Sequence, residues 1–272
     1  MSRTEGARDW SLCPPGTTVV GLSRPAAAKL QSEIRQQNFL ILDEDCLRPA
    51  REVEIPGFKI STFPVTFDEF LEWRLGRGRS IAEGFNRYWE EKFESIDRLA
   101  NLPVVGATLE EAHGFACSVG ARLPYRIEWI YAARGPVKLE QFSDENFRDQ
   151  VPQNANWSLD CDSFEEPTLS LRPVAESTIP TWCGARDMWG NADELTLSKA
   201  WFSPATRQRI GEYECERRHS YMECGMMTTV QDASFSSWIV TGLSWNDNGL
   251  LIPYRPGMTG FRLAMDVDFD DL

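Results

Sequence analysis

Long apolar runs are missing from this chain, and without them it has no evident way to cross a bilayer. A membrane-spanning helix needs roughly 20 mostly apolar residues, and no uncharged apolar stretch of the sequence approaches that length. The first residues, Met1–Asp9, also lack the apolar core of a secretory signal. We therefore expect a cytoplasmic protein with neither a membrane segment nor a signal peptide.

Cysteine pairs with the usual metal-binding spacing are absent too. No two cysteines form a Cys-x-x-Cys motif, and their number, seven, is odd. In a reducing compartment such residues are mostly small buried side chains or free thiols. Cys215, His219 and Cys224 lie close together and could hold zinc or copper. Their spacing matches no standard module, and the surrounding glutamates favour an exposed loop with free thiols.

Positive charge is scarce. The sequence holds 28 Lys and Arg against 41 Asp and Glu, a formal charge of −13. This excess would repel nucleic-acid phosphates rather than neutralise them, so we expect no nucleic-acid partner. Hydrophobic residues make up 42% of the chain and include 10 Trp and 15 Phe, which is enough to build a core. The length of 272 residues allows one large domain or two small ones.

Two helices joined by a rigid corner are predicted over residues 101–135. Thr108 and Glu111 have the spacing of a capping box, in which each side chain satisfies a backbone N–H of the first turn. Behind them an apolar stripe of helical spacing comprises Leu109, Ala112, Phe115, Ala116 and Val119. Gly120 is placed to end this helix in the left-handed conformation, and Pro124 suits the first turn of the next. The buried face and the stop of that second helix are expected at Ile127, Ile130, Tyr131, Ala133 and Gly135.

Shorter patterns predict the other elements. Thr66 and Glu69 make a second capping box. The apolar face and the stop of its helix are expected at Phe67, Phe70, Leu71 and Gly76. Residues 77–99 carry aromatics at helical spacing and predict an amphipathic helix, for which core packing is favoured over partner binding. Residues 23–35 favour a helix and residues 38–43 a strand.

Beyond these elements the sequence contains several short blocks in a fixed order. They are VEIPGFKI from Val53, PVTFDEF from Pro64, PVVG from Pro103, GARLP from Gly120, EW from Glu128, YAARG from Tyr131, NANW from Asn154, PV from Pro173, DMWGNADE from Asp187 and GFRLA from Gly260. Together they resemble the formylglycine-generating enzyme/sulfatase-modifying factor family, although any one block alone would be a weak match. The resemblance implies an α+β domain with a C-type-lectin-like fold and much irregular structure. We expect this domain over residues 51–272, with residues 1–50 as an N-terminal extension packed on it.

The same resemblance implies calcium sites. The family binds calcium through side-chain oxygens alternating with backbone carbonyls, an arrangement that suits an ion taking six to eight oxygen ligands. The positions that match are Asp187, Gly190, Ala192 and Glu194. A second, less regular match comprises Asn156, Trp157 and Asp162. We expect structural Ca²⁺, and the alternative is that Asp187 and Glu194 only brace a turn.

The family's oxidase site has no equivalent ligands here. Its enzymes oxidise a substrate cysteine with oxygen, using copper held by two cysteines, because Cu(I) requires soft thiolates. Counting from Ser244, the two thiolate positions fall on Asp247 and Ile252. Relatives that form sulfoxides hold iron with three histidines, whereas this chain has two, His113 and His219. We therefore expect neither copper nor iron and interpret the chain as a catalytically degenerate member, a pseudoenzyme.

Ligand binding is the function that remains. Loops on a rigid scaffold commonly carry binding contacts, and the face of the lost site would be lined by Ser244, Trp245, Asn246, Asp247, Asn248, Tyr254 and Arg255. Trp, Tyr and Arg are typical anchors of an interface, although Trp245 could instead pack in the core. We predict a module that binds a protein, peptide or small ligand. The alternatives are an oxidoreductase of the same superfamily that uses other residues with copper or iron, and a structural subunit of a larger assembly.

Overall fold

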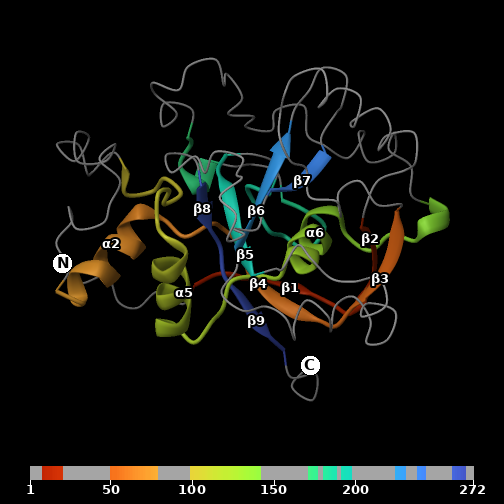
Figure 1. The fold of residues 1–272 in the computed structure, drawn as a ribbon, viewed down its shortest axis with the longest axis horizontal. Coiled ribbons are helices and arrows are strands. Elements are labelled where there is room, and N and C mark those ends of the chain that lie inside the picture. The colour runs from red at the N-terminus through yellow and green to blue at the C-terminus, as the bar shows by residue number, and fades with distance from the viewer. Residues whose placement is uncertain are drawn as a thin grey trace, which may run out of the picture.

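Helices and strands are mixed along the chain, as expected for an α+β domain (Figure 1). The computed structural model describes residues 8–20, 50–78, 99–141, 171–176, 180–188, 191–197, 224–230, 238–242 and 259–267. The helices in these ranges are α2 (Phe67–Gly76), α5 (Leu109–Ser118) and α6 (Arg126–Arg134), with 3-10 turns at Leu139–Gln141 and Val174–Glu176. The strands are β1 (Trp10–Cys13), β2 (Gly16–Val20), β3 (Arg51–Ile55), β4 (Phe58–Ser61), β5 (Asp193–Leu197), β6 (Cys224–Val230), β7 (Trp238–Gly242), β8 (Thr259–Phe261) and β9 (Ala264–Asp266). Within these ranges no helix has the length and apolar character that crossing a membrane requires.

Strand β4 brings the first and last described strands into one sheet. It pairs antiparallel with β1 on one edge, Trp10 opposite Ser61, and with β9 on the other, Phe58 opposite Asp266. Strands β2 and β3 form an antiparallel pair, and a four-stranded sheet has the order β7-β6-β5-β8. In that sheet β5 runs parallel to β8 and antiparallel to β6, which is antiparallel to β7. Strands β7 and β8 therefore run in the same direction at opposite edges.

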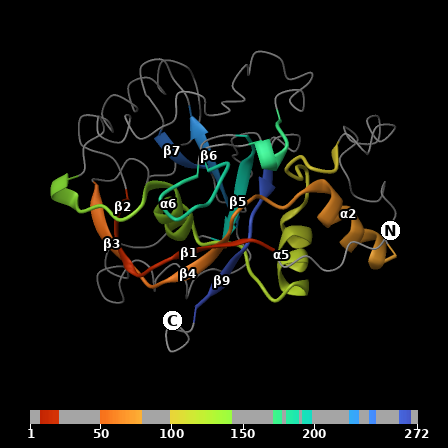
Figure 2. The ribbon, with the colours of Figure 1, turned by 180° about the vertical axis from the view of Figure 1, so that it is seen from behind.

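Residues 10–20 form two strands that the sequence patterns did not predict. We expected an N-terminal extension over residues 1–50, and its described part supplies β1 and β2, which pair with β4 and β3 respectively. Figure 2 shows β1 lying alongside β4. The helix expected over residues 23–35, the strand over 38–43 and most of the helix over 77–99 lie outside the described residues.

Both predicted capping boxes are confirmed. At α5 the Thr108 N–H donates to the Glu111 carboxylate at 3.1 Å, and the Glu111 N–H donates to Thr108 Oγ1 at 3.2 Å. At α2 the corresponding distances between Thr66 and Glu69 are 2.8 and 3.4 Å. Gly120 takes the expected left-handed conformation after α5, with φ of 70°. Helix α2 ends at Gly76 as expected.

Helix α6 is buried on all sides rather than along one face. Every residue from Arg126 to Arg134 is buried, including both arginines. The helix contacts β2 and β3 as well as β5 and β6, so sheets cover it from more than one direction. Pro124 lies before the helix rather than in its first turn, because the N-cap is Tyr125, whose N–H donates to the Glu128 carboxylate at 2.8 Å. The helix ends at Gly135, as predicted, with φ of 84°.

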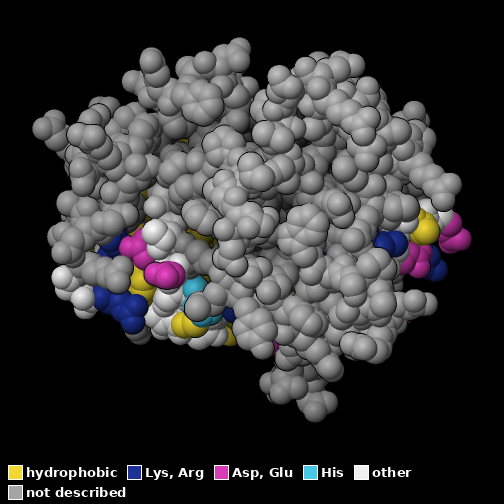
Figure 3. Space-filling view, viewed as in Figure 1, with side chains coloured by type: hydrophobic (Ala, Val, Ile, Leu, Met, Phe, Trp, Pro, Cys, Tyr) yellow, Lys and Arg dark blue, Asp and Glu magenta, His cyan; other side chains and the backbone are white. Residues whose placement is uncertain are grey.

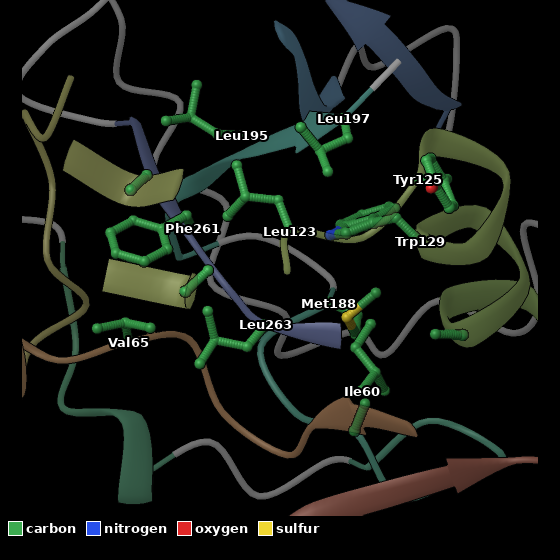
Figure 4. Close-up of a cluster of buried hydrophobic side chains, with 14 of the residues drawn as sticks. Ile60, Val65, Leu123, Tyr125, Trp129, Met188, Leu195, Leu197, Phe261 and Leu263 are labelled. Carbon is green, nitrogen blue, oxygen red and sulfur yellow. The ribbon is translucent and has the colours of Figure 1, made fainter. Parts of the chain in front are cut away.

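The core between the helices and the four-stranded sheet is built partly by the closing Gly260-Phe-Arg-Leu-Ala segment. Phe261 and Leu263 point into it beside Leu123, Val65 and Leu195 (Figure 4). The Phe261 ring packs edge-on against Phe70 and Phe115, with centroids 5.8 and 5.7 Å away. A Cβ at position 260 would overlap the Val104 carbonyl oxygen, so this segment needs glycine where it passes the 103–106 loop.

Candidate functional site

The loop that leads into β5 contains the first predicted calcium site. Of its members the structure describes Asp187, Ala192 and Glu194, while Gly190 lies outside the described residues. Asp187 and Asn191 both have positive φ, 57° and 75°, which is uncommon for residues other than glycine. The Asn191 side chain holds the turn by accepting from Arg172 N at 2.9 Å and donating to Arg172 O at 3.1 Å.

Glu194 is joined to Arg262 in a buried ion pair. Both side chains are almost completely inaccessible. Arg262 Nε donates to Oε2 at 2.5 Å and Nη2 donates to Oε1 at 2.6 Å, the two-pronged geometry that makes arginine–carboxylate pairs strong. Trp129 Nε1 also donates to Oε2 at 2.6 Å. The carboxylate is thereby neutralised by a cation of its own chain.

Arg262 also connects the sheets to the loop before β5. Its Nη1 donates to the Ser61 carbonyl at 3.3 Å, and its Nη2 donates to the Arg186 carbonyl at 2.9 Å. One guanidinium thus links the end of β4, the loop beside Asp187 and the carboxylate on β5. No local sequence pattern indicated this role, because the groups are distant in sequence.

The calcium assignment stays a prediction. Glu194 accepts three hydrogen bonds, two at Oε2 and one at Oε1. Oε1 therefore has more remaining capacity to bind an ion than Oε2. Among the residues that the structure describes, no group of three or more acidic, histidine or cysteine side chains is placed to hold a metal. The second predicted site, Asn156, Trp157 and Asp162, lies outside the described residues.

Arg122 ties helix α6 to the last strand. It donates to both Glu128 oxygens at 2.7 Å and to Asp266 at 2.5 Å, and it lies over the Tyr125 ring at 4.5 Å. Burial alone would lower the pKa of Arg122, but the Glu128 and Asp266 carboxylates outweigh it and raise that pKa, so the guanidinium stays charged. Arg122, the arginine of the GARLP block, therefore has a structural role, because its charge joins α6 to β9.

On the face shown in Figure 3, the described charged side chains include both signs. In the space-filling view, acidic and basic side chains are interleaved near α2 and α5 and again at the opposite end of the molecule (Figure 3). The seven residues predicted to bind a ligand, Ser244, Trp245, Asn246, Asp247, Asn248, Tyr254 and Arg255, lie outside the described residues. So do Cys215 and His219 of the cysteine–histidine group.

A family model agrees with the sequence blocks over nearly the whole chain. The model is described as "Sulfatase-modifying factor enzyme 1-like domain", and it matches residues 2–266. The chain belongs to this family. The matched region includes the strands β1 and β2 within the segment that we expected to be an extension.

The relatives of this chain include proteins named as an oxygenase and as an inactive enzyme. The chain is 27% identical over 93% of its length to hercynine oxygenase from Mycolicibacterium thermoresistibile, of which it covers 59%. It is 28% identical over 55% of its length to inactive C-alpha-formylglycine-generating enzyme 2 from Mus musculus, of which it covers 61%. The chain therefore spans less than two thirds of the length of these relatives.

Solved structures share the fold of this family member. PvdO from Pseudomonas aeruginosa superposes with a TM-score of 0.55 at 16% identity, covering 95% of this chain and 94% of PvdO. CarF superposes with a TM-score of 0.51 at 18% identity, covering 96% of this chain and 99% of CarF. The expected formylglycine-generating-enzyme fold is thus confirmed.

Among the described residues, no donor set is assembled for the copper or iron that the family implies. No cysteine follows Cys224 in the sequence, so the C-terminal segment cannot supply the two thiolates that Cu(I) requires. His113 lies on α5 with its Nε2 3.6 Å from Cys117 Sγ, and no third ligand is assembled with it among the described residues.

Proposed function

We propose that this chain is a formylglycine-generating-enzyme-type domain that has lost copper-dependent oxidation and serves as a binding module. Its ligand is a protein, a peptide or a small molecule, held by the segment from Ser244 to Arg255. The proposal depends most on one observation, the replacement of the two expected thiolates by Asp247 and Ile252. A carboxylate is a hard ligand and a hydrocarbon is none, so neither residue suits Cu(I).

The preserved scaffold around this segment supports a binding role. The segment is flanked by β7 and β8, which run in the same direction at opposite edges of the four-stranded sheet. A connection between such strands is a crossover, which is long enough to carry binding loops. Its C-terminal flank is fixed by Gly260 against Val104 and by the Glu194–Arg262 pair. The similarity to a protein named an inactive formylglycine-generating enzyme supports the same interpretation.

An oxidase assay tests the first half of the proposal. The full chain is treated anaerobically with Cu(I), exposed to air with a cysteine-containing peptide, and assayed for loss of peptide thiol and appearance of an aldehyde. We expect no turnover above a copper-only blank. The Asp247→Cys/Ile252→Cys double variant serves as the control and should retain additional Cu(I) against a chromogenic chelator. Copper-dependent aldehyde formation by the wild type would overturn the proposal.

Substitutions in the proposed segment test the second half. Wild type, Trp245→Ala and Arg255→Ala are compared as immobilised baits, and retained proteins and small molecules are identified by mass spectrometry. Leu75→Ala, which changes an exposed apolar side chain on α2, is the matched control. We expect ligands retained by the wild type and by Leu75→Ala but lost from the other two variants. Ligands that all four proteins retain would place the binding face elsewhere, and a large fall in Tm for Trp245→Ala would place Trp245 in the core.

An oxygen-dependent oxidoreductase is the second candidate, favoured by the similarity to a protein named hercynine oxygenase over 93% of this chain. Such an activity would need ligands other than the family's three histidines. Elemental analysis of the purified full chain, combined with oxygen uptake in the presence of a thiol, separates the candidates. Stoichiometric iron with thiol-dependent oxygen uptake would favour this second function over the binding module.

A further inference from the structure

Strand β1 and the turn at residues 181–184 lie against each other although they are far apart in sequence. A Cβ on Gly184 would lie 3.5 Å from Ser11 Oγ, so the turn passes close to the Ser11 side chain. Ser11 Oγ is 3.0 Å from Thr62 Oγ1, and the Thr62 carbonyl accepts from Arg186 N at 2.7 Å. The turn itself is closed by the Gly184 N–H, which donates to the Thr181 carbonyl at 2.9 Å.

Each of these two segments carries a cysteine, and each of the two thiols shifts the pKa of the other, so the thiols lie close together. Cys13, at the end of β1, is fully buried, whereas Cys183, in the turn, is partly exposed. The Cys183 sulfur is also 3.3 Å from Thr181 Oγ1 and donates to the Ala132 carbonyl at 3.6 Å. The Cys183 sulfur is therefore held in place by its own turn and by helix α6.

Helix α6 fixes both cysteine-bearing segments. The Tyr131 hydroxyl donates to the Pro14 carbonyl at 2.9 Å, next to Cys13. Trp182, next to Cys183, donates from Nε1 to the Tyr131 carbonyl at 2.8 Å, and its ring packs edge-on against Tyr131 at 5.0 Å. One helical residue thus holds the neighbours of both thiols, so they remain adjacent without a large movement of either segment.

We propose that Cys13 and Cys183 are a dithiol site that a low-molecular-weight disulfide converts reversibly into an intramolecular disulfide. The bond would join the N-terminal strand to the turn before β5. This proposal does not depend on the function assigned to the segment from Ser244 to Arg255.

The oxidation is a pair of thiol–disulfide exchanges. The Cys183 thiolate attacks one sulfur of the small disulfide, forms a mixed disulfide and releases one small thiolate, which takes up a proton. Cys13 then loses its proton and attacks the Cys183 sulfur, which releases the second small thiol. Two protein thiols are oxidised, and one small disulfide is reduced to two thiols.

The surroundings assign different roles to the two cysteines. The hydrogen bond from Cys13 lowers the pKa of Cys183 to about 6; Thr181 and Arg262 also lower it, although burial raises it. The pKa of Cys13 is raised by the same hydrogen bond, by burial and by the charge of Glu128. Burial raises the pKa of Tyr131, another titratable neighbour of the two thiols, to about 12, so Tyr131 stays neutral at pH 7. Cys183 is thus the attacking thiolate at neutral pH, and Cys13 is the buried partner that resolves the mixed disulfide.

Oxidation of the full chain by oxidised glutathione tests the site. The reduced protein is incubated at pH 7, quenched with acid, treated with N-ethylmaleimide and digested for mass spectrometry. We expect a Cys13–Cys183 cross-linked peptide that disappears with dithiothreitol, with neither cysteine alkylated. Cys117 is the internal control, since it is exposed and contacts His113, and it should carry a glutathione adduct.

Two variants distinguish the roles of the cysteines. Cys183→Ser should leave Cys13 reduced and alkylated, and Cys13→Ser should leave glutathione on Cys183. If Cys13→Ser does not fold, the wild type and Cys183→Ser still decide the question. The proposal is overturned if wild-type Cys183 keeps its glutathione while Cys13 is alkylated. It is also overturned if both stay reduced under conditions that modify Cys117.

Discussion

Replacing Arg262 by methionine would remove the cation of the buried pair while keeping a long apolar side chain. The Glu194 carboxylate would lose two of its three donors and retain Trp129. The Ser61 and Arg186 carbonyls would also lose a donor each. An uncompensated buried charge is among the few changes that destabilise a protein severely.

The expected loss is large on the scale of a single domain. Removing one partner of a buried pair costs about 3–5 kcal/mol in free energy of unfolding. With roughly 2–4 °C per kcal/mol for a domain of this size, Tm should fall by about 6–20 °C. The stability of Arg262→Lys should lie between those of the wild type and Arg262→Met, because lysine keeps the charge but cannot donate in two-pronged geometry.

Urea unfolding of four proteins measures this directly: wild type, Arg262→Met, Glu194→Leu and the double variant. The double variant should be more stable than the sum of the single losses predicts, by about 1–3 kcal/mol, because it leaves no buried charge unpaired. The m-values should agree, so that midpoints report stability. A loss under about 1 kcal/mol for Arg262→Met, or strict additivity in the double variant, would show that this pair is not the buried interaction inferred here.

Four further outcomes are expected. Gly260→Ala should lower Tm, measured by calorimetry, because its Cβ would overlap the Val104 carbonyl, whereas Gly76→Ala, where the structure leaves open space, should not. Thr108→Ala should lower the free energy of unfolding in urea by about 1 kcal/mol through loss of the α5 cap. If calcium binds at the loop before β5, EDTA should lower the Tm of the wild type but not that of Asp187→Ala. The pKa of Cys183 is lowered from 9.0 to about 6, so its thiolate persists down to about pH 6. The rate at which iodoacetamide labels Cys183 should therefore decrease near pH 6, whereas an ordinary cysteine would lose reactivity near pH 9.

Local signals in the sequence were sufficient for the caps of helices α2 and α5. The caps at Thr66 and Thr108 and the stop at Gly120 were predicted correctly because each depends on residues within one helical turn. The buried face of α6 was underestimated, because its periodicity cannot reveal that sheets cover it from several directions. The family resemblance, not the periodicity, supplied the fold.

Interactions between distant residues were out of reach. Arg122 and Asp266 are 144 residues apart, and Glu194 and Arg262 are 68 apart, so no spacing rule joins them. The β-branched run Thr17–Val20 is itself a local signal for strand β2. The ligand-binding segment was predicted by counting from a family motif, and its residues remain a prediction.

The arrangement of β4 between β1 and β9 has a consequence for synthesis on the ribosome. Strand β4 can pair with β1 early, but its other edge has no partner until β9, Ala264–Asp266, has emerged. A nascent or truncated chain therefore presents an open strand edge to other chains, which invites aggregation. Deleting residues 264–272, which include β9, should therefore strongly reduce the yield of soluble protein, although the deletion is short.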